Sequence, residues 1–138
     1  MCGRILRTGL SLLAIVLLPG CATSPVPADK ADPVPKNRLF AFSGKSESQL
    51  VVTRDSGLYG SGCNYRLYID GALAAEFASG EVARFGVRAG KHILGIKPSA
   101  ACGGWGLVER EVDVKTGETV RRRITLSGDN FDISPTAI

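Results

Sequence analysis

The stretch YRLYIDGALAAEF, residues 65–77, contains two short apolar runs on either side of Asp70 and Gly71. Apolar and polar residues alternate along both runs, which is the pattern of half-buried strands. Asp-Gly is a strong turn signal, because glycine accepts the positive φ that tight hairpins require. The stretch therefore predicts a β-hairpin with strands near Tyr65–Ile69 and Leu73–Phe77.

Short apolar runs separated by glycine-containing turns continue through residues 38–138, and no stretch shows a convincing 3.6-residue period. A chain of 138 residues has room for one ordinary domain. We therefore expect an all-β fold, a small antiparallel β-sandwich of about seven to nine strands. The remaining strands are expected near Leu39–Phe42, Gln49–Thr53, Val82–Val87, His92–Lys97, Leu107–Val114, Val120–Leu126 and Phe131–Ile133.

A second hairpin is predicted at Lys115–Glu118, where Gly117 lies in a polar turn. Pairing the strands on either side of this turn places opposite charges next to each other. The expected pairs are Val114 with Val120, Asp113 with Arg121, and Glu111 with Arg123. The same register places Arg110 and Arg122 on the apolar face, where a buried guanidinium needs a partner. Either the sheet is open there, or a bulge changes the register.

Residues 1–20 have the layout of a signal peptide, with Arg4 and Arg7 ahead of the apolar run Leu10–Leu18. This run is shorter than the ~20 residues that a transmembrane helix needs. Removal of the two arginines reduces the formal net charge from +4 to +2. A surplus that small gives no basic surface for nucleic acid, so no nucleic-acid partner is expected.

The segment Leu18-Pro19-Gly20-Cys21 resembles the lipobox of bacterial lipoproteins, with an aliphatic residue three positions before the cysteine and a small residue directly before it. The resemblance implies that Cys21 becomes a lipidated N-terminus, which binds the membrane through its acyl chains. Ala22 follows instead of the aspartate that retains lipoproteins in the inner membrane, which implies the periplasmic face of the outer membrane. The alternative is an ordinary secretory signal followed by a coincidental cysteine.

Residues 21–37 combine the cysteine with a proline-rich segment that holds four of the seven prolines and almost no large apolar residue. Such a composition cannot bury a core. We expect a disordered, extended tether whose sixteen residues after Cys21 reach roughly 50 Å from the membrane. The alternative is a proline-rich recognition motif.

The region 65–126 contains a set of turn and core residues: Ile69-Asp70-Gly71, the strand from Val87 to Ala89-Gly90-Lys91-His92, and Val112, Val114, Gly117, Glu118, Ile124 and Leu126. On these residues the region resembles the PEGA repeat and related small β-sandwich domains of bacterial surface proteins, including lipoproteins of the DUF2846 type. The resemblance implies the fold and says little about activity.

Four cysteines are present. If Cys2 leaves with the signal peptide and Cys21 is lipidated, Cys63 and Cys102 remain as free thiols in an oxidising compartment and should form a disulfide. It would join two glycine-rich loops. The alternatives, a metal site or a catalytic thiol, would need His or acidic partners that are not near in sequence.

Two aromatic residues in these loops, Tyr59 and Trp105, form a candidate binding surface. The competing interpretation is that Trp105 folds back to cap the sandwich. Arg121 and Arg123 belong to a basic run that is either a contact for anionic lipid, lipopolysaccharide or peptidoglycan, or a solvated strand paired with acidic neighbours.

The sequence contains one histidine, His92, and no catalytic triad is visible. His92 is expected on the face of Leu94 and Ile96, as a hydrogen-bonded residue at the margin of the core. Acidic and amide residues at 129, 130 and 132 suggest calcium, but their spacing is typical of a polar turn. No cofactor and no metal are expected.

The leading hypothesis is a non-enzymatic outer-membrane lipoprotein that binds an envelope protein or glycan, or has a structural role there. The alternative is an inhibitor of a periplasmic hydrolase such as lysozyme. An envelope enzyme that uses His92 or Asp55 is a third hypothesis.

Overall fold

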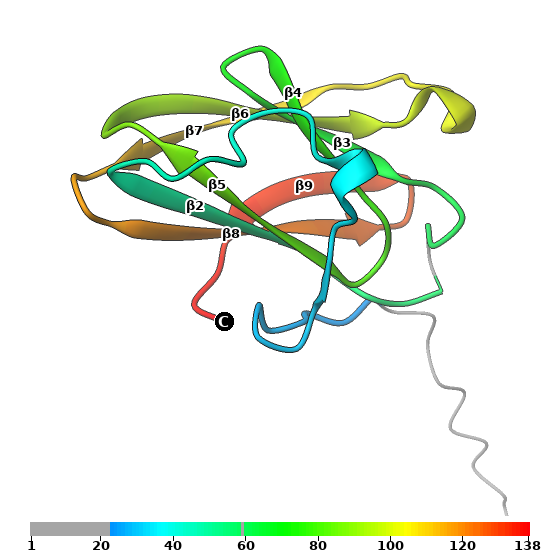
Figure 1. The fold of residues 1–138 in the computed structure, drawn as a ribbon. Helices are drawn as coiled ribbons and strands as arrows, with labels where there is room; N and C mark the ends of the chain where they lie inside the picture. The colour runs from blue at the N-terminus through cyan, green and yellow to red at the C-terminus, as the bar shows by residue number, and fades with distance from the viewer. Residues whose placement is uncertain (1–22, 59) are drawn as a thin grey trace, which may run out of the picture.

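In the computed structural model, which describes residues 23–58 and 60–138, nine strands form two facing sheets (Figure 1). One sheet has the order β1-β5-β2-β8-β9 and the other has the order β4-β3-β6-β7. The strands are β1 (Asp32–Pro33), β2 (Ser48–Arg54), β3 (Tyr65–Ile69), β4 (Ala72–Phe77), β5 (Glu81–Val87), β6 (Gly90–Pro98), β7 (Val108–Val114), β8 (Thr119–Ser127) and β9 (Asn130–Pro135). The predicted all-β sandwich is confirmed.

The core lies between the two sheets and is built from the inward-facing side chains of both. Phe77 of β4 and Phe85 of β5 contact each other across it, with ring centroids 6.5 Å apart. Alternation along the strands produces this arrangement, because every second residue points to the same face. The fully buried apolar members of the cluster include Leu50, Val52, Leu67, Ile69, Phe77, Phe85, Leu94, Ile96 and Ile124.

The hairpin predicted at Asp70-Gly71 is confirmed. β3 and β4 pair antiparallel, and Ile69 lies opposite Ala72 across the turn. Both turn residues have positive φ, 50° at Asp70 and 81° at Gly71. That conformation matches the right-handed twist of the flanking strands, and the Asp-Gly sequence favours it.

The hairpin predicted at Lys115–Glu118 is wrong. The turn itself is tight, with the Glu118 N–H donating to the Lys115 carbonyl at 3.0 Å, but the strands on either side belong to different sheets. β7 pairs with β6, whereas β8 lies between β2 and β9. The flanking valines, Val114 and Val120, are both buried in the core, and the turn between them carries the chain from one sheet to the other.

The charge pairs expected from that hairpin are therefore also wrong. Glu111 pairs with Lys91 at 3.1 Å, and Arg123 pairs with Asp55 at 3.4 Å. β8 pairs with both of its neighbours without a register shift, so no bulge displaces Arg122. Arg122 is half-buried, and the exposed Arg110 reaches Asp132 of β9 at 3.2 Å. The Arg110–Asp132 pair thus links the edge strands of the two sheets, β7 and β9.

The strand predicted at Leu39–Phe42 is also wrong. A short 3-10 helix, η1 (Lys36–Arg38), precedes this segment, and Leu39 forms only an isolated bridge with Ala75. Phe42 has a φ of 61°, which an extended strand does not allow. The chain at this point turns from one sheet edge to the next.

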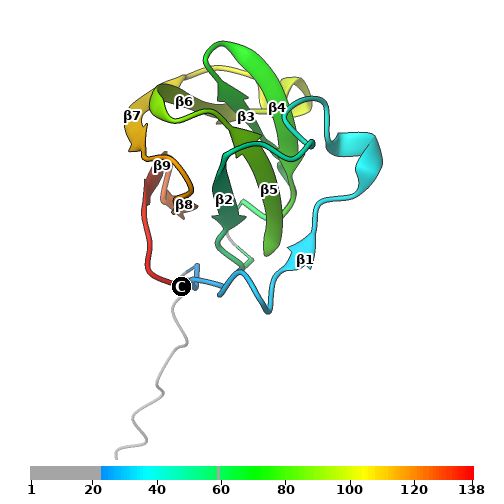
Figure 2. The same ribbon diagram turned by 60° about the vertical axis from the view of Figure 1, so that its left-hand side comes forward.

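The prediction that the proline-rich segment is a disordered spacer that buries nothing is wrong for residues 24–37. Val34 is buried, and β1 is the edge strand of its sheet and runs parallel to β5 (Figure 2). The N–H groups of Asp32 and Val34 donate to the carbonyls of residues 80 and 82 at 3.1 and 2.9 Å. The alternate positions are Pro33 and Pro35, which lack an N–H. Prolines two residues apart therefore suit an edge strand, because only every second N–H faces the sheet.

Arg38 secures this N-terminal segment. Its guanidinium forms a two-fold contact with the carboxylate of the buried Glu81, at 2.7 and 2.5 Å, and donates to the Glu76 carbonyl at 2.9 Å. Bidentate pairs of this kind fix orientation as well as adding energy. The segment covers the edge of β5, which would otherwise present unpaired backbone groups to solvent.

Candidate binding site

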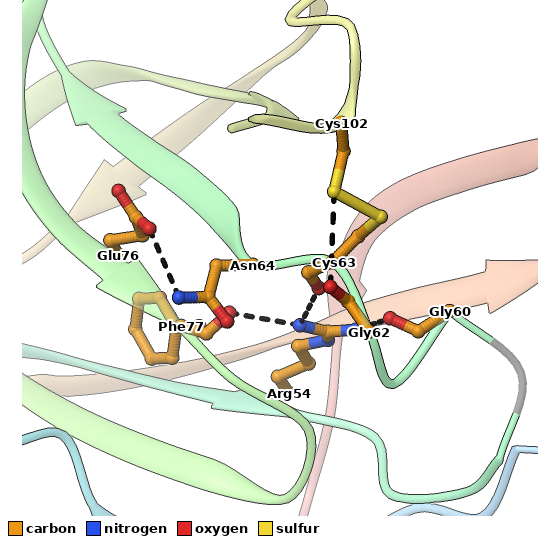
Figure 3. The surroundings of a disulfide bond; sticks show 8 residues. All are labelled: Arg54, Gly60, Gly62, Cys63, Asn64, Glu76, Phe77 and Cys102. Atoms are coloured by element: carbon orange, nitrogen blue, oxygen red, sulfur yellow. Dashed lines mark hydrogen bonds between the residues drawn. A yellow bond between two sulfur atoms is a disulfide. The ribbon is translucent and has the colours of Figure 1, made fainter. Parts of the chain in front are cut away.

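The predicted disulfide between Cys63 and Cys102 is confirmed, with a Cα–Cα distance of 5.8 Å and a sequence separation of 39 residues (Figure 3). It joins the loop before β3 to the short 3-10 helix η2 (Ala100–Cys102) after β6. Both loops lie at the same end of the sandwich, together with the turn between β8 and β9 (Figure 1). We call this the disulfide end.

Arg54, at the end of β2, is the central residue behind the disulfide. Its side chain is 1 % exposed and lies on the inward face that also carries Leu50 and Val52. The guanidinium donates to the carbonyls of Gly60 at 2.7 Å, Cys63 at 2.6 Å and Phe77 at 2.9 Å (Figure 3). One cation therefore holds Gly60 and Cys63 to the end of β4.

The surroundings of Arg54 are aromatic. Its guanidinium lies 4.9 Å from the ring centroid of Tyr65, and that ring contacts Phe131 edge to face at 5.2 Å. Burial lowers the pKa of Arg54 below its ordinary value, although Tyr65 and Glu81 oppose the shift. A guanidinium stays charged in such a site, because its reference pKa lies far above neutrality.

A cleft of about 360 Å³ opens beside the disulfide. Its wall is formed by residues from β3, β6, β8, β9 and the two stapled loops. Asp129 is the one carboxylate among the described lining residues, and the others are apolar, aromatic, sulfur-bearing or glycine. The wall includes Cys63, Tyr65, Cys102, Trp105, Leu126 and Phe131.

Trp105 does not cap the sandwich, so that interpretation is wrong. Its side chain is 63 % exposed at the rim of the cleft. The loop folds this way because Gly103, with a φ of 94°, lets the indole approach the backbone. A Cβ at that position would lie 2.6 Å from an indole carbon of Trp105. Leu58, on the other stapled loop, is 84 % exposed.

The structure does not bring the predicted arginines together with Trp105. Arg121 is exposed on β8, five residues before the Leu126 that lines the cleft. Arg123 forms an ion pair with Asp55, whose side chain is 3 % exposed. Burial raises the pKa of Asp55, and the neighbouring Arg123 counteracts part of that shift. Arg123 thus balances a buried carboxylate.

His92 is hydrogen-bonded at the margin of the core, as predicted, and lies away from the cleft. Its ring nitrogens contact the Asp70 carboxylate at 2.6 Å and the Arg88 carbonyl at 2.7 Å. Burial tends to lower the pKa of His92, but these two hydrogen bonds outweigh it and raise the pKa above its ordinary value.

Two predicted residues, Cys21 and Tyr59, lie outside the residues that the structure describes. Within residues 23–58 and 60–138, no three His, Cys, Asp or Glu side chains gather as metal ligands would. Asp132 of the acidic turn pairs with Arg110. The same ranges contain no helix with the length and apolar character needed to cross a membrane.

Sequence reasoning missed Arg54. The signal was present, because Leu50, Val52 and Arg54 alternate along one strand and therefore share a face. An arginine at the end of such a run is expected at the rim of the core, with its charge satisfied by carbonyls from neighbouring loops.

No protein-family model, no curated protein and no solved structure matches this chain. The disulfide end is therefore interpreted from its own residues.

Proposed function

We propose that the protein is a lipid-anchored, non-enzymatic binding module on the periplasmic face of the outer membrane, and that the disulfide end is its binding surface. The observation that carries the proposal is the Cys63–Cys102 disulfide, in a chain whose next cysteine upstream is in a lipobox-like segment. Persistent disulfides belong to oxidising compartments such as the periplasm. The two features support the same location independently.

The chemistry of the cleft favours binding over catalysis. Tyr65 of β3, Phe131 of β9 and Trp105 supply flat aromatic surfaces, and the disulfide fixes the loop that carries Trp105. The described hydrogen bonds of Arg54 all go to backbone carbonyls behind the wall of the cleft. Rigid aromatic groups on stapled loops bind partners with a small loss of conformational entropy.

The test is the chemical state of Cys21. The full chain, with its signal segment, is expressed in a Gram-negative host with an alkyne-tagged palmitate, and the mature protein is analysed by mass spectrometry. We expect a diacylglyceryl thioether and an amide-linked acyl chain on Cys21. Cys21→Ser should remove the label, whereas Cys63→Ser should keep it. An unmodified residue 21 in the wild-type chain contradicts the proposal.

A second candidate function, inhibition of a periplasmic hydrolase such as lysozyme, has one observation in its favour. Trp105 projects from a stapled loop, a shape suited to entering an enzyme cleft. A lysozyme assay with the wild-type chain and with Trp105→Ser tests it. Inhibition that disappears in the variant would support this function over the first.

A further inference from the structure

The first described residues are fixed to the disulfide end. The Thr23 hydroxyl donates to the Leu126 carbonyl at 3.0 Å, and Ser24 and Ser56 exchange backbone hydrogen bonds of 2.7 and 2.9 Å. Cys21 precedes Thr23 by two residues, so the Cα atoms of these two residues lie within about 8 Å of each other. Any lipid on Cys21 therefore enters the bilayer next to this end of the sandwich.

The exposed apolar side chains of the stapled loops lie at the same end. Leu58 follows Ser56, the bridge partner of Ser24, by two residues. Trp105 lines the cleft together with Leu126, whose carbonyl accepts the Thr23 hydroxyl. Leu58 and Trp105 are 84 % and 63 % exposed. Figure 1 shows both loops at the end of the sandwich where the described chain begins.

Neither stapled loop contains a charged residue. The stretches SGLYGSGCN, residues 56–64, and PSAACGGWGL, residues 98–107, contain no Asp, Glu, Lys or Arg, in a chain that is 22 % charged. A charge that enters the hydrocarbon core of a bilayer is costly to desolvate, whereas tryptophan is favoured at the interface above it because its ring is apolar and its N–H is polar. The composition of the loops suits a lipid interface better than free solvent.

We propose that the partner of the disulfide end is the phospholipid leaflet that holds the acyl chains of Cys21, and that Leu58 and Trp105 enter its interfacial layer. This inference rests on the proposed lipidation. The domain then lies directly on the membrane, and the cleft opens onto the headgroups. The opposite end, with His92 and Asp70, faces away from the bilayer.

The chain has a single tryptophan, so its fluorescence reports this one site. The full chain is purified in its acylated form and reconstituted into vesicles of phosphatidylethanolamine and phosphatidylglycerol, with and without brominated acyl chains. Trp105 should emit at shorter wavelength than in detergent-free buffer and lose most of its intensity to the brominated lipid. Leu58→Ser should weaken the quenching.

The matched control relocates the single tryptophan to a different face of the sandwich. In the double variant Trp105→Phe and Ile93→Trp, the tryptophan occupies the outward face of β6, where Ile93 is 40 % exposed. Its emission should be quenched by aqueous iodide and not by brominated lipid. Circular dichroism of both variants checks that the sandwich is retained.

The outcomes separate the two proposals. An acylated chain whose Trp105 is quenched by iodide and not by brominated lipid overturns membrane docking and leaves the lipid anchor standing. A chain without acyl groups on Cys21, established by its mass, overturns both. Quenching of Trp105 and of the relocated tryptophan to the same extent also contradicts the proposed orientation.

Discussion

The two ends of the sandwich are held by different kinds of interaction. At the far end, Asp70 and Gly71 form a two-residue turn, and the Asp70 carboxylate binds the His92 ring and the Ile93 N–H. At the disulfide end, the loops depend on a covalent link across 39 residues and on Arg54. Short-range turn chemistry builds the first end. Long-range contacts build the second, which leaves Leu58 and Trp105 free to meet a partner.

The largest expected effect comes from removing the covalent link. The double variant Cys63→Ser and Cys102→Ser should lose roughly 4 kcal/mol of unfolding free energy, the chain-entropy value for a loop of this length. Urea denaturation followed by circular dichroism measures it, with the reduced wild-type chain as control. A loss below about 1 kcal/mol would show that the disulfide end is held by other contacts.

Arg54→Leu should have the next largest effect, about 3 kcal/mol, because three carbonyls lose their donor in a place that water reaches poorly. The unfolding free energy of Arg54→Lys should lie between those of Arg54→Leu and the wild type, because an ammonium group keeps the charge but lacks the planar guanidinium. Denaturation midpoints of the three chains provide the comparison. If the lysine variant unfolds at the same midpoint as the leucine variant, the contacts to the three carbonyls do not account for the stabilisation by Arg54.

The contribution of the far end to the unfolding free energy should depend on pH, but only weakly. Burial tends to raise the pKa of Asp70, but hydrogen bonds from His92 and the Ile93 N–H outweigh it and lower that pKa. The Asp70 contribution is therefore present above its ordinary value of 3.8 and is lost as pH falls through the folded-state pKa. The raised pKa of His92 gives a contribution that is present below 6.5 and is lost as pH rises through the folded-state pKa.

The Asp70–His92 pair should thus be strongest between about pH 4 and 6.5, and be worth less than about 1 kcal/mol, because the Asp70 side chain is 47 % exposed. His92→Gln should abolish the loss of stability above pH 6.5 while leaving the disulfide end unchanged. Unfolding free energies of both chains across the pH range measure it. Identical pH profiles would contradict the assignment.

The smallest effect on stability is expected at Trp105. Trp105→Ser should change the unfolding free energy by no more than about 0.5 kcal/mol, because the side chain is largely exposed. The same substitution should remove the membrane contact of the disulfide end. Vesicle flotation measures this contact in two chains that both carry Cys21→Ser, one with Trp105 and one with Trp105→Ser, by the fraction of protein that floats with the vesicles. A destabilisation comparable to that of Arg54→Leu would show that Trp105 belongs to the core.

Local patterns predicted most of the strands and one hairpin of the fold. Alternation located β2 to β9, and Asp-Gly fixed the β3–β4 hairpin. The Lys115–Glu118 turn was identified, but a turn does not determine whether its strands pair or face each other across a core. That depends on β2, which takes β8 as its parallel neighbour from about seventy residues away.

The N-terminal segment and Arg54 show the same limit. Proline density predicted an extended spacer, yet the spacing of Pro33 and Pro35 matches the alternate hydrogen bonds of an edge strand on β5. Arg54 lies within the alternation of β2, but its carbonyl partners come from β4 and a loop that the sequence does not place. The disulfide of the candidate site was predicted from the sequence, and the exposure of Trp105 was one of two interpretations that the sequence left open. The arginine that supports the loops was not predicted.

In the proposed orientation, the domain lies directly on the membrane at its disulfide end, with no spacer between the lipid anchor and the sandwich. Neutron reflectometry of the acylated full chain on a supported phospholipid bilayer measures this directly. We expect a protein layer in contact with the headgroups. A water layer of roughly 50 Å between bilayer and protein, the reach of an extended residue 22–37 segment, would contradict it.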